Sequence, residues 1–287
     1  MTDFIISAFT DEASPSLEGQ LEALKRNHLS YVELRNVDGR CVIDFSDEEL
    51  EELHRVLEAH HISVSAIASP IGKISIREDF APHFARFRRA VEAAKILKTQ
   101  RIRIFSFFLS PQDDPKECRA EVLRRLGEIC DYANANGVRC CHENEKEIYG
   151  DIASRVLDLH ETFQEKMAGV FDPANYVQCG VRPQELFPQL LPYTDYLHVK
   201  DALFADGSVV PAGKGDAGIG EILDAYHRPG AGRLLSVEPH LFQFGGLSAL
   251  QNDPLKHKNV YATADEAFDA AVNSLKELLT ERGYSYE

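Results

Sequence analysis

The sequence predicts a single α/β domain with the architecture of a (β/α)8 TIM barrel. Its 287 residues suit one large barrel or two ordinary domains, and no linker-like change of composition divides the chain. Short β-like runs alternate with amphipathic helical stretches eight times, which implies a parallel sheet. No GxGxxG motif follows the first run, which disfavours a dinucleotide-binding doubly wound sheet. We therefore expect one barrel domain over residues 1–287.

Each expected strand is a short run rich in apolar and β-branched residues. A period-two alternation or a continuous apolar run of this length is typical of strands that are covered by helices. In chain order the expected strands are 4–9, 30–35, 62–69, 101–108, 137–143, 167–173, 195–201 and 233–239.

A helical stretch follows each of these runs. Ser46 is a plausible N-cap, and Glu49 three residues later completes a capping-box pattern. Asn136 and Gly137 form a pair that tolerates the left-handed conformation, and they are expected to end the fourth helix. Strand eight is expected to be followed by an extended loop over 241–262. In chain order the helical stretches are 16–27, 46–61, a long stretch ending near 98, 115–137, 152–163, 183–191, 219–227 and 263–283.

Charge and composition exclude several functional classes. The net charge of −15 repels nucleic-acid phosphates, and no cluster of Lys and Arg offsets it. No run of about 18 apolar residues is present, so we expect no membrane span. The acidic N-terminus lacks the pattern of a signal peptide, and the six cysteines form no CxxC pair. We expect a cytoplasmic protein with reduced thiols and with no nucleic-acid or membrane partner.

Four consecutive expected strands end in residues that can bind a metal. These are Glu143 in HEN, Asp172 in FDP, His198 in LHVKD and Glu238 in VEPH. The active sites of such barrels lie at the carboxyl ends of the strands, so the four side chains are expected to meet. Three carboxylates and one imidazole suit Mn²⁺, Co²⁺, Mg²⁺ or Zn²⁺.

Side-chain alternation supports most of this set. If His198 points into the barrel, Lys200 does too, because successive strand residues face opposite sides. Strand five fits less well, since an inward Glu143 also places Cys141 and Arg139 inside. Because strand ends often bend, the inward placement of Cys141 and Arg139 weakens the alternation argument only for strand five.

Each of these residues also has an ordinary structural interpretation. Glu143 can be a solvated acid at a helix start, Asp172 a turn residue before proline, and His198 a core histidine with satisfied hydrogen bonds. The joint occurrence on neighbouring strands favours the metal site over these separate explanations. The neighbouring Glu145 and Glu147 are expected on the solvated rim, where they favour the N-terminus of the next helix.

The set HEN, FDPAN, HVKD and VEPH, on eight strand–helix units, resembles the sugar phosphate isomerase/epimerase family. These xylose-isomerase-like TIM barrels also include ketose 3-epimerases, hydroxypyruvate isomerases, inosose dehydratases and endonuclease IV. The resemblance runs through most of the chain and is strongest from 138 to 245. It implies that Glu143, Asp172, His198 and Glu238 bind one divalent metal ion, with Mn²⁺ as the first expectation and Zn²⁺, Co²⁺ or Mg²⁺ as alternatives. It also implies that Glu143 and Glu238 move the proton.

Proton transfer at such a site also has a physical basis. A proton α to a carbonyl is a poor acid, and a divalent cation stabilises the enediolate as its charge develops. A carboxylate on one face of the substrate removes the proton, and a second one returns it for epimerisation. We therefore expect a metal-dependent sugar or keto-sugar isomerase or epimerase. The alternatives are an inosose-type dehydratase on the same site and a non-catalytic sugar-binding barrel.

A second group of residues is expected to contact the substrate. Lys200 can instead form a buried ion pair with Asp201 or Glu238, and Glu33 can pair with Arg35. The Gly-rich segment 209–220 can cradle a phosphate or act as a lid. The full predicted substrate-binding set is Lys200, His240, Asn175, Glu33 and Arg35.

The chain departs from the relatives that it resembles at particular positions. Ketose 3-epimerases have histidine where this chain has Asn175 and arginine where it has Phe204. The resemblance therefore implies the metal chemistry more strongly than the substrate contacts, and it does not establish a free ketohexose as the substrate. Endonuclease IV needs additional histidines for three zinc ions, whereas strand three here ends at Ser69. DNA repair is therefore not expected. A homodimer or homotetramer is an expectation from the resemblance.

Overall fold

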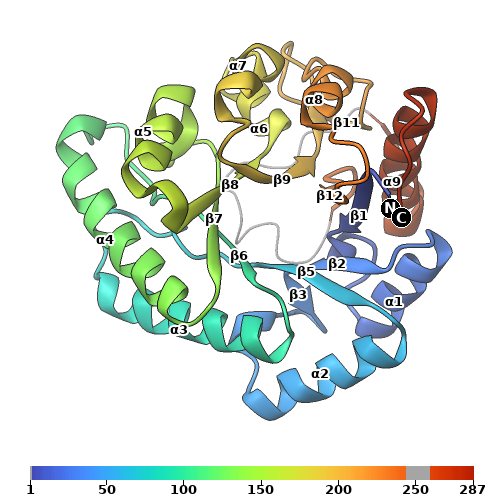
Figure 1. Ribbon diagram of the computed structural model, residues 1–287, viewed down its shortest axis with the longest axis horizontal. Helices are drawn as coiled ribbons and strands as arrows, with labels where there is room; N and C mark the ends of the chain where they lie inside the picture. Colours follow the sequence, from blue (N-terminus) through green and yellow to red (C-terminus); the bar gives the residue numbers. More distant parts are fainter. Residues whose placement is uncertain (1, 244–258) are drawn as a thin grey trace.

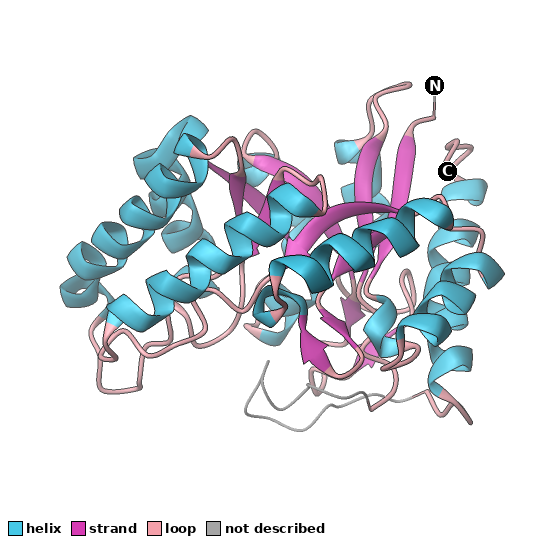
Figure 2. Cartoon of the chain, turned by 90° about the horizontal axis from the view of Figure 1, so that it is seen from below, coloured by secondary structure: helices cyan, strands magenta, loops and turns pink. Residues whose placement is uncertain are grey.

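Eight parallel strands surround a central axis and are enclosed by helices (Figure 1). The computed structural model describes residues 2–243 and 259–287. The strands run in the same direction, so that their carboxyl ends share one end of the barrel (Figure 2). They confirm the predicted TIM barrel, and they are β1 (Phe4–Ala8), β2 (Tyr31–Leu34), β5 (Ser63–Ala68), β6 (Arg101–Ile104), β7 (Arg139–Glu143), β8 (Met167–Phe171), β9 (Thr194–Val199) and β12 (Arg233–Val237).

The hydrogen-bonded order of the sheet is β1-β12-β9-β8-β7-β6-β5-β2. β1 and β2 are neighbours at the remaining seam, which makes the barrel nearly closed. The C-terminal residues lie along β1, where the backbone N–H of Ile6 donates to the carbonyl of Glu287 (2.8 Å) and the N–H of Glu287 donates to that of Phe4 (3.1 Å). The two ends of the chain therefore lie side by side (Figure 1).

Most helices follow the predicted stretches, and α6 (Pro173–Gln178) lies where no helix was predicted. Ser46 and Glu49 form the predicted capping box, and Gly137 adopts a positive φ of 72° after the fourth long helix. The α-helices are α1 (Leu17–Arg26), α2 (Asp47–Ala59), α3 (Phe80–Ile96), α4 (Pro115–Ala135), α5 (Ala153–Phe163), α6 (Pro173–Gln178), α7 (Pro183–Leu190), α8 (Ile219–Tyr226) and α9 (Ala264–Glu281).

Short elements decorate the loops between these units. Two antiparallel hairpins are formed by β3 (Asn36–Val37) with β4 (Arg40–Cys41) and by β10 (Asp201–Ala202) with β11 (Val209–Val210). Single-turn 3₁₀-helices are η1 (Thr10–Glu12), η2 (Val42–Asp44), η3 (Tyr149–Asp151) and η4 (Gln164–Lys166). Most of the predicted loop 241–262 lies outside the described residues.

The core has two layers, as expected for this architecture. A large apolar cluster fills the space between strands and helices, and a small one fills the barrel interior. The interior cluster contains Ala66, Cys141, Ala168, Val170, Tyr196 and Leu234. Cys141 thus points inward, as an inward Glu143 requires. Arg139 is exposed because it begins β7 and lies at the opposite rim of the barrel.

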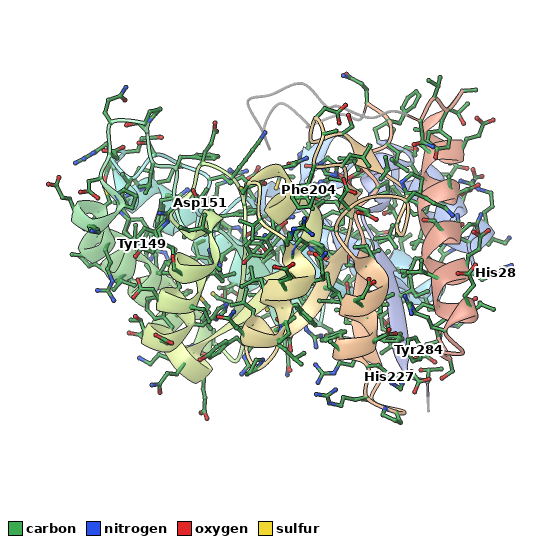
Figure 3. The ribbon with its side chains drawn as sticks, turned by 90° about the horizontal axis from the view of Figure 1, so that it is seen from above. His28, Tyr149, Asp151, Phe204, His227 and Tyr284 are labelled. Carbon is green, nitrogen blue, oxygen red and sulfur yellow. The ribbon has the colours of Figure 1, made fainter. Side chains whose placement is uncertain are left out.

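The two ends of the barrel carry different residues. Asp151 and Phe204 belong to loops at the carboxyl ends of the strands (Figure 3). His227 and Tyr284 lie at the other end, where their rings stack with centroids 4.3 Å apart. Within residues 2–243 and 259–287, no helix has the length and hydropathy needed to span a membrane.

Candidate metal centre

The four predicted ligands meet at the carboxyl ends of four neighbouring strands. Glu143 ends β7, Asp172 follows β8, His198 lies in β9 and Glu238 follows β12. One donor atom from each lies within 4.8 Å of the others, and all four residues are buried. A barrel brings these positions together because parallel strands in register end on the same rim.

The imidazole of His198 is oriented by carboxylates on both of its nitrogen atoms. Nδ1 lies 3.2 Å from Oε1 of Glu143, 3.8 Å from Oε2 of Glu238 and 3.9 Å from Oδ2 of Asp172. Nε2 lies 3.2 Å from Oε2 of Glu33. Nδ1 is therefore the nitrogen that faces the other three donor groups.

The loop after β8 holds Asp172 in place through the start of α6. Oδ1 of Asp172 accepts the backbone N–H of Asn175 (2.9 Å), so Asp172 is the N-cap and Pro173 follows it at the first helical position. The backbone of Asp172 also exchanges two hydrogen bonds of 2.9 Å with the side-chain amide of Asn144. This arrangement leaves Oδ2 of Asp172 facing the other donors.

The donor set fits a divalent cation in both chemistry and charge. Oε2 of Glu143 and Oδ2 of Asp172 are buried and accept no well-aligned hydrogen bond from the described residues. Around His198 the structure buries six carboxyl groups and three permanent cations. A divalent ion would be attracted by the ionised carboxylates among them and would take their oxygen atoms as ligands. The carboxylates are Asp11, Glu12, Glu33, Glu143, Asp172 and Glu238, and the cations are Arg35, Arg103 and Lys200.

Burial and neighbouring charges shift the pKa values of the donor groups. Burial raises the pKa of Asp172 to about 7, against the attraction of Lys200. Burial also opposes ionisation of Glu143, but the charges of His198 and Arg103 outweigh it and lower the pKa of Glu143 to about 2. The pKa of Glu238 is likewise held well below its usual value, because Lys200 outweighs burial. Both glutamates are thus carboxylates at neutral pH.

The predicted substrate-binding residues Lys200 and Arg35 contact the same centre. Nζ of Lys200 lies 2.7 Å from Oε2 of Glu238 and 2.9 Å from Oδ2 of Asp172. The alternative of an ion pair with Glu238 is therefore present. Arg35 binds Asp11 through two hydrogen bonds of 2.8 and 2.9 Å, and its Nη1 lies 3.6 Å from Oε1 of Glu238.

Glu33 lies on the side of His198 that faces away from the other ligands. Besides His198 it accepts a hydrogen bond of 2.9 Å from the hydroxyl of Tyr196, and its side chain is fully buried. Arg35 instead pairs with Asp11 and Glu12 and lies near Glu238, so the alternative Glu33–Arg35 pair is not formed among the residues that the structure describes. These contacts favour a role in orienting the imidazole.

His240 and Asn175 complete the predicted set. The backbone N–H of His240 donates to Oε2 of Glu12 (2.6 Å), and its Nδ1 lies 3.8 Å from Oε1 of Glu238. Nδ2 of Asn175 lies 3.3 Å from Oε1 of Glu143 and donates to the carbonyl of Asn144 (2.9 Å). Direct contact of either residue with a substrate stays a prediction.

Three parts of the site escaped the sequence analysis. Nη1 of Arg103 lies 3.3 Å from Oε2 of Glu143, and the ring of Phe9 meets the imidazole of His198 edge-on with centroids 5.1 Å apart. Asp11 and Glu12 in η1 hold Arg35. The signals were a basic residue inside an apolar strand, RIRIF, and acids directly after the first strand, FTDEA.

Glu12, Glu238 and His240 form a second group of donor atoms beside the first. It shares Glu238 with the main centre, and Nη2 of Arg35 lies 3.0 Å from Oε1 of Glu12. The guanidinium already supplies positive charge to this group, so we assign it no separate ion.

The Gly-rich segment 209–220 is organised around Asp201. Its carboxylate accepts the backbone N–H groups of Gly213 (2.9 Å), Gly215 (2.9 Å) and Ala217 (3.1 Å). A Cβ atom on Gly215 would lie 2.2 Å from Oδ1 of Asp201, so only glycine fits there. Of the two roles left open for this segment, a phosphate cradle is not available to these three N–H groups, because an internal carboxylate accepts them.

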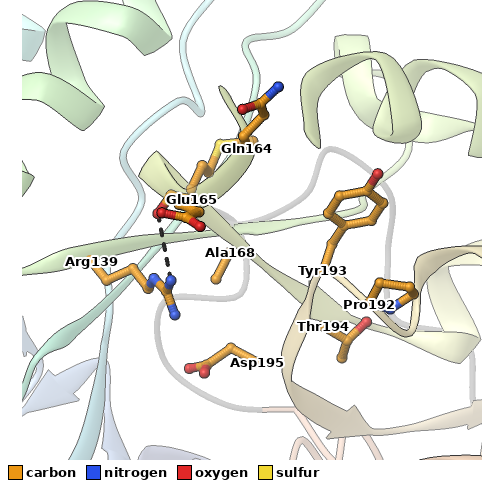
Figure 4. A pocket seen from close by; sticks show the side chains of 9 residues that line it. Arg139, Gln164, Glu165, Ala168, Pro192, Tyr193, Thr194 and Asp195 are labelled. Carbon is orange, nitrogen blue, oxygen red and sulfur yellow. Dashed lines mark hydrogen bonds between the residues drawn. The ribbon is translucent and has the colours of Figure 1, made fainter. Parts of the chain in front are cut away.

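A separate pocket lies at the amino ends of β7, β8 and β9 (Figure 4). It has a volume of about 380 Å³, and Arg139, Glu165 and Asp195 are among its lining residues. Nη2 of Arg139 donates to the carbonyl of Glu165 across 3.5 Å. The pocket is at the opposite end of the strands from the candidate metal centre.

Comparisons with known proteins agree with this fold. A family model described as xylose isomerase-like TIM barrel matches residues 21–278.

Solved structures with the same fold include several enzymes. A probable 3-DHS dehydratase, AsbF of Bacillus anthracis, is 18% identical with a TM-score of 0.73, and the match covers 95% of this chain and 98% of that one. A zinc-binding IOLI protein is 17% identical with a TM-score of 0.74 and coverages of 98% and 99%. A D-psicose 3-epimerase, solved with D-fructose, is 15% identical with a TM-score of 0.73 and the same coverages. A search of curated proteins found no significant match.

Proposed function

This chain belongs to the xylose isomerase-like TIM barrel family, and on that premise we propose that it is a divalent-metal-dependent sugar or keto-sugar isomerase or epimerase. The observation that carries the proposal is the meeting of Glu143, Asp172, His198 and Glu238 at one buried point of the catalytic rim. The D-psicose 3-epimerase among the structural neighbours supports a sugar substrate. The oligomeric state and the absence of a nucleic-acid partner stay predictions.

The four residues would hold one divalent ion, with His198 contributing Nδ1. Bound there, the ion would polarise a substrate carbonyl and stabilise the negative charge that develops when an adjacent proton leaves. The zinc-bound neighbour supports a divalent ion of this kind. Mn²⁺ remains our first expectation, and the metal preference is a quantity to be measured.

Glu143 and Glu238 are the proposed acid and base. They stand on strands separated by β8 and β9, so they approach the centre from different sides. In the metal-free protein each is a carboxylate because of nearby cations, His198 and Arg103 beside Glu143 and Lys200 beside Glu238, and a carboxylate can accept a proton. For isomerisation, the glutamate that accepted the proton would deliver it to the neighbouring carbon. For epimerisation, the second glutamate would need to carry a proton of its own, taken up from water, which it would deliver to the other face.

A dehydratase is the second candidate, because one structural neighbour is a probable dehydratase. It would begin with the same removal of an α-proton and then expel a hydroxyl group as water. A non-catalytic sugar-binding barrel is disfavoured, since the chain retains the complete set of donor groups. The products separate the first two classes: an isomerase or epimerase conserves the formula of the sugar, and a dehydratase lowers its mass by one water.

Metal content per chain is the first test. The wild type is expected to bind about one divalent ion per chain, and His198→Ala and Glu238→Gln are expected to bind less. The matched controls are His60→Ala, directly after α2, and Glu51→Gln, within α2, and both positions are exposed. Binding of close to three zinc ions would favour a phosphodiesterase, and no binding of Mn²⁺ or Zn²⁺ would refute the proposal.

Catalysis is tested by incubating the loaded protein with keto sugars in deuterium oxide. Incorporation of deuterium next to the carbonyl without loss of mass supports isomerisation or epimerisation. Glu143→Gln and Glu238→Gln are expected to lower the exchange by at least about a hundredfold. Formation of an unsaturated or deoxy product would assign the dehydratase instead.

A further inference from the structure

Lys200 contacts the same carboxylate oxygens that face Nδ1 of His198. Its Nζ lies 2.7 Å from Oε2 of Glu238 and 2.9 Å from Oδ2 of Asp172. These two oxygens are the ones that lie 3.8 and 3.9 Å from Nδ1 of His198. The ammonium group therefore occupies the position at which a cation would bridge Asp172 and Glu238.

We propose that Lys200 is an internal counter-cation of the metal centre, which holds Asp172 and Glu238 together in the metal-free protein and releases their oxygens when a divalent ion binds. The proposal rests on the metal site of the proposed function and goes beyond it. In addition to any contact with substrate, Lys200 would occupy the carboxylate oxygens when the metal is absent and leave them when the metal binds.

The other permanent cations of the centre are held elsewhere. Arg35 is anchored by two hydrogen bonds to Asp11, and Arg103 lies on Glu143 and is packed against the ring of Phe105 at 4.8 Å. Of the permanent cations in the described parts of the chain, Lys200 alone is paired with Asp172. Without Lys200 or a metal, the buried carboxylate of Asp172 would lack a counter-charge apart from the more distant His198.

Charge and side-chain flexibility make Lys200 the group that moves. A divalent ion bound to Asp172 and Glu238 would sit about 2.0–2.2 Å from their oxygens. An ammonium group on the same oxygens would then lie within a few ångström of it, where two cations in a buried site repel each other strongly. The lysine side chain has a flexible four-carbon stem and can turn away, whereas a forked guanidinium is tied by several bonds.

A supporting role for Lys200 makes the opposite prediction. If the ammonium merely positioned the two carboxylates for the metal, its removal would disorder them and weaken metal binding. If it competes with the metal, its removal strengthens binding, because the incoming ion no longer displaces a cation. The sign of the change in affinity therefore decides between the two roles.

The test is calorimetric titration of the metal-free protein with Zn²⁺ and with Mn²⁺. Lys200→Met is expected to lower the dissociation constant by about tenfold or more relative to the wild type. Lys73→Met is the control, because Lys73 is also buried but is paired with Glu145, outside the ligand set. Its dissociation constant is expected to stay within about twofold of the wild type. An unchanged or higher dissociation constant in Lys200→Met would overturn the proposal.

Unfolding measurements and a second variant guard against a folding defect. Without metal, Lys200→Met and Lys200→Gln are expected to melt at a lower temperature than the wild type. Added metal is expected to raise the melting temperature of both variants by more than it raises that of the wild type. If added metal raises the melting temperature of both variants by the same amount as in the wild type, or by less, the proposed exchange of Lys200 for the metal is contradicted. Failure of the wild type and of both variants to bind any metal would refute the metal centre and this proposal together, whereas normal wild-type binding with weaker binding in the variants refutes the exchange alone.

The wild type provides a test that needs no folded variant at this position. In protein labelled with ¹⁵N-lysine, buried ammonium groups give resolved signals because their protons exchange slowly. Addition of diamagnetic Zn²⁺ is expected to shift or broaden the Lys200 signal strongly and to leave the Lys73 signal, identified from Lys73→Met, nearly unchanged. A Lys200 signal that does not respond at saturating Zn²⁺ would overturn the proposal.

Discussion

Nε2 of His198 lies 3.2 Å from Oε2 of Glu33, on the side of the imidazole opposite to Nδ1, which faces the other three candidate ligands. In an imidazole that offers the lone pair of Nδ1 to a metal, the proton stays on Nε2, where the carboxylate of Glu33 would accept it in a hydrogen bond. Burial lowers and the two carboxylates raise the pKa of His198, to about 10 in the metal-free protein. Glu33 therefore binds a proton donor in both the neutral and the charged imidazole.

Glu33→Gln is expected to weaken metal binding about tenfold to a hundredfold. The amide keeps the size of the side chain but supplies no negative charge, so the imidazole is oriented less firmly and is a poorer ligand. Isothermal titration with Zn²⁺ measures the change. Tyr196→Phe is the matched control, because it removes the 2.9 Å hydrogen bond to Glu33 and leaves the carboxylate in place. Equal affinities of Glu33→Gln and the wild type would contradict this role.

Asp201→Asn is expected to lower the free energy of unfolding by about 2 kcal/mol. The carboxylate accepts four backbone N–H groups, those of Ala202, Gly213, Gly215 and Ala217, and an amide cannot accept all of them. Urea unfolding measures the loss. Asp206→Asn, where the carboxylate accepts the N–H of Ser208, is expected to cost less than about 1 kcal/mol. Similar losses in the two variants would argue against Asp201 as the organiser of this loop.

The stability of the protein is expected to fall between pH 6.5 and pH 4, in part through His83. Nε2 of His83 accepts the backbone N–H of Gly72 (2.7 Å), and burial lowers its pKa to about 4. Because the folded state then binds fewer protons than the unfolded state in this window, stability is complete above pH 6.5 and is lost as the pH falls. Urea unfolding at pH 7.5 and pH 5 measures the slope.

The matched variant for this pH effect is His83→Gln, which retains an acceptor but does not titrate. Its loss of stability from pH 7.5 to pH 5 is expected to be smaller than that of the wild type. Comparing the two proteins at each pH isolates His83 from the other groups that titrate in this range. An identical loss in both proteins would show that His83 does not contribute.

Gly72→Ala is expected to destabilise the fold by about 3 kcal/mol. Gly72 has a φ of 92°, and a Cβ atom there would lie 2.1 Å from the carbonyl oxygen of Phe105 in the neighbouring loop. Gly39→Ala has a similar positive φ of 74° with no atom within 4 Å, and its expected cost is about 1 kcal/mol. Thermal unfolding of both variants measures the difference, and equal costs would refute the steric argument.

The positions of the four candidate ligands followed from the sequence because a barrel imposes them. Once eight strand–helix units are counted, the ends of four consecutive strands must share one rim, and Glu143 and His198 must face inward if their alternation holds. The inward position of Cys141 shows that the alternation does hold in β7. Local patterns sufficed here because they depend only on strand direction and on the two-residue repeat.

Pairings between distant segments could not be predicted in the same way. The sequence left open an ion pair between Glu33 and Arg35, whereas Glu33 lies against His198, 165 residues away, and Arg35 lies against Asp11 and Glu12. Contact of Glu33 with a substrate stays a prediction. Each of these charged groups had several chemically reasonable partners, and the shape of the barrel interior selects one of them.

The sequence by itself determined the barrel, the rim at which its strands end and the four candidate ligands that meet there. Only the tertiary structure decided that Lys200 bridges Asp172 and Glu238 and that the carboxylate of Asp201 accepts the N–H groups of Gly213 and Gly215 in the glycine-rich loop. The physical reason is the separation along the chain of the residues that interact. Strand and helix patterns are local, whereas the partner of a buried charge is set by close packing of segments that are far apart in the chain.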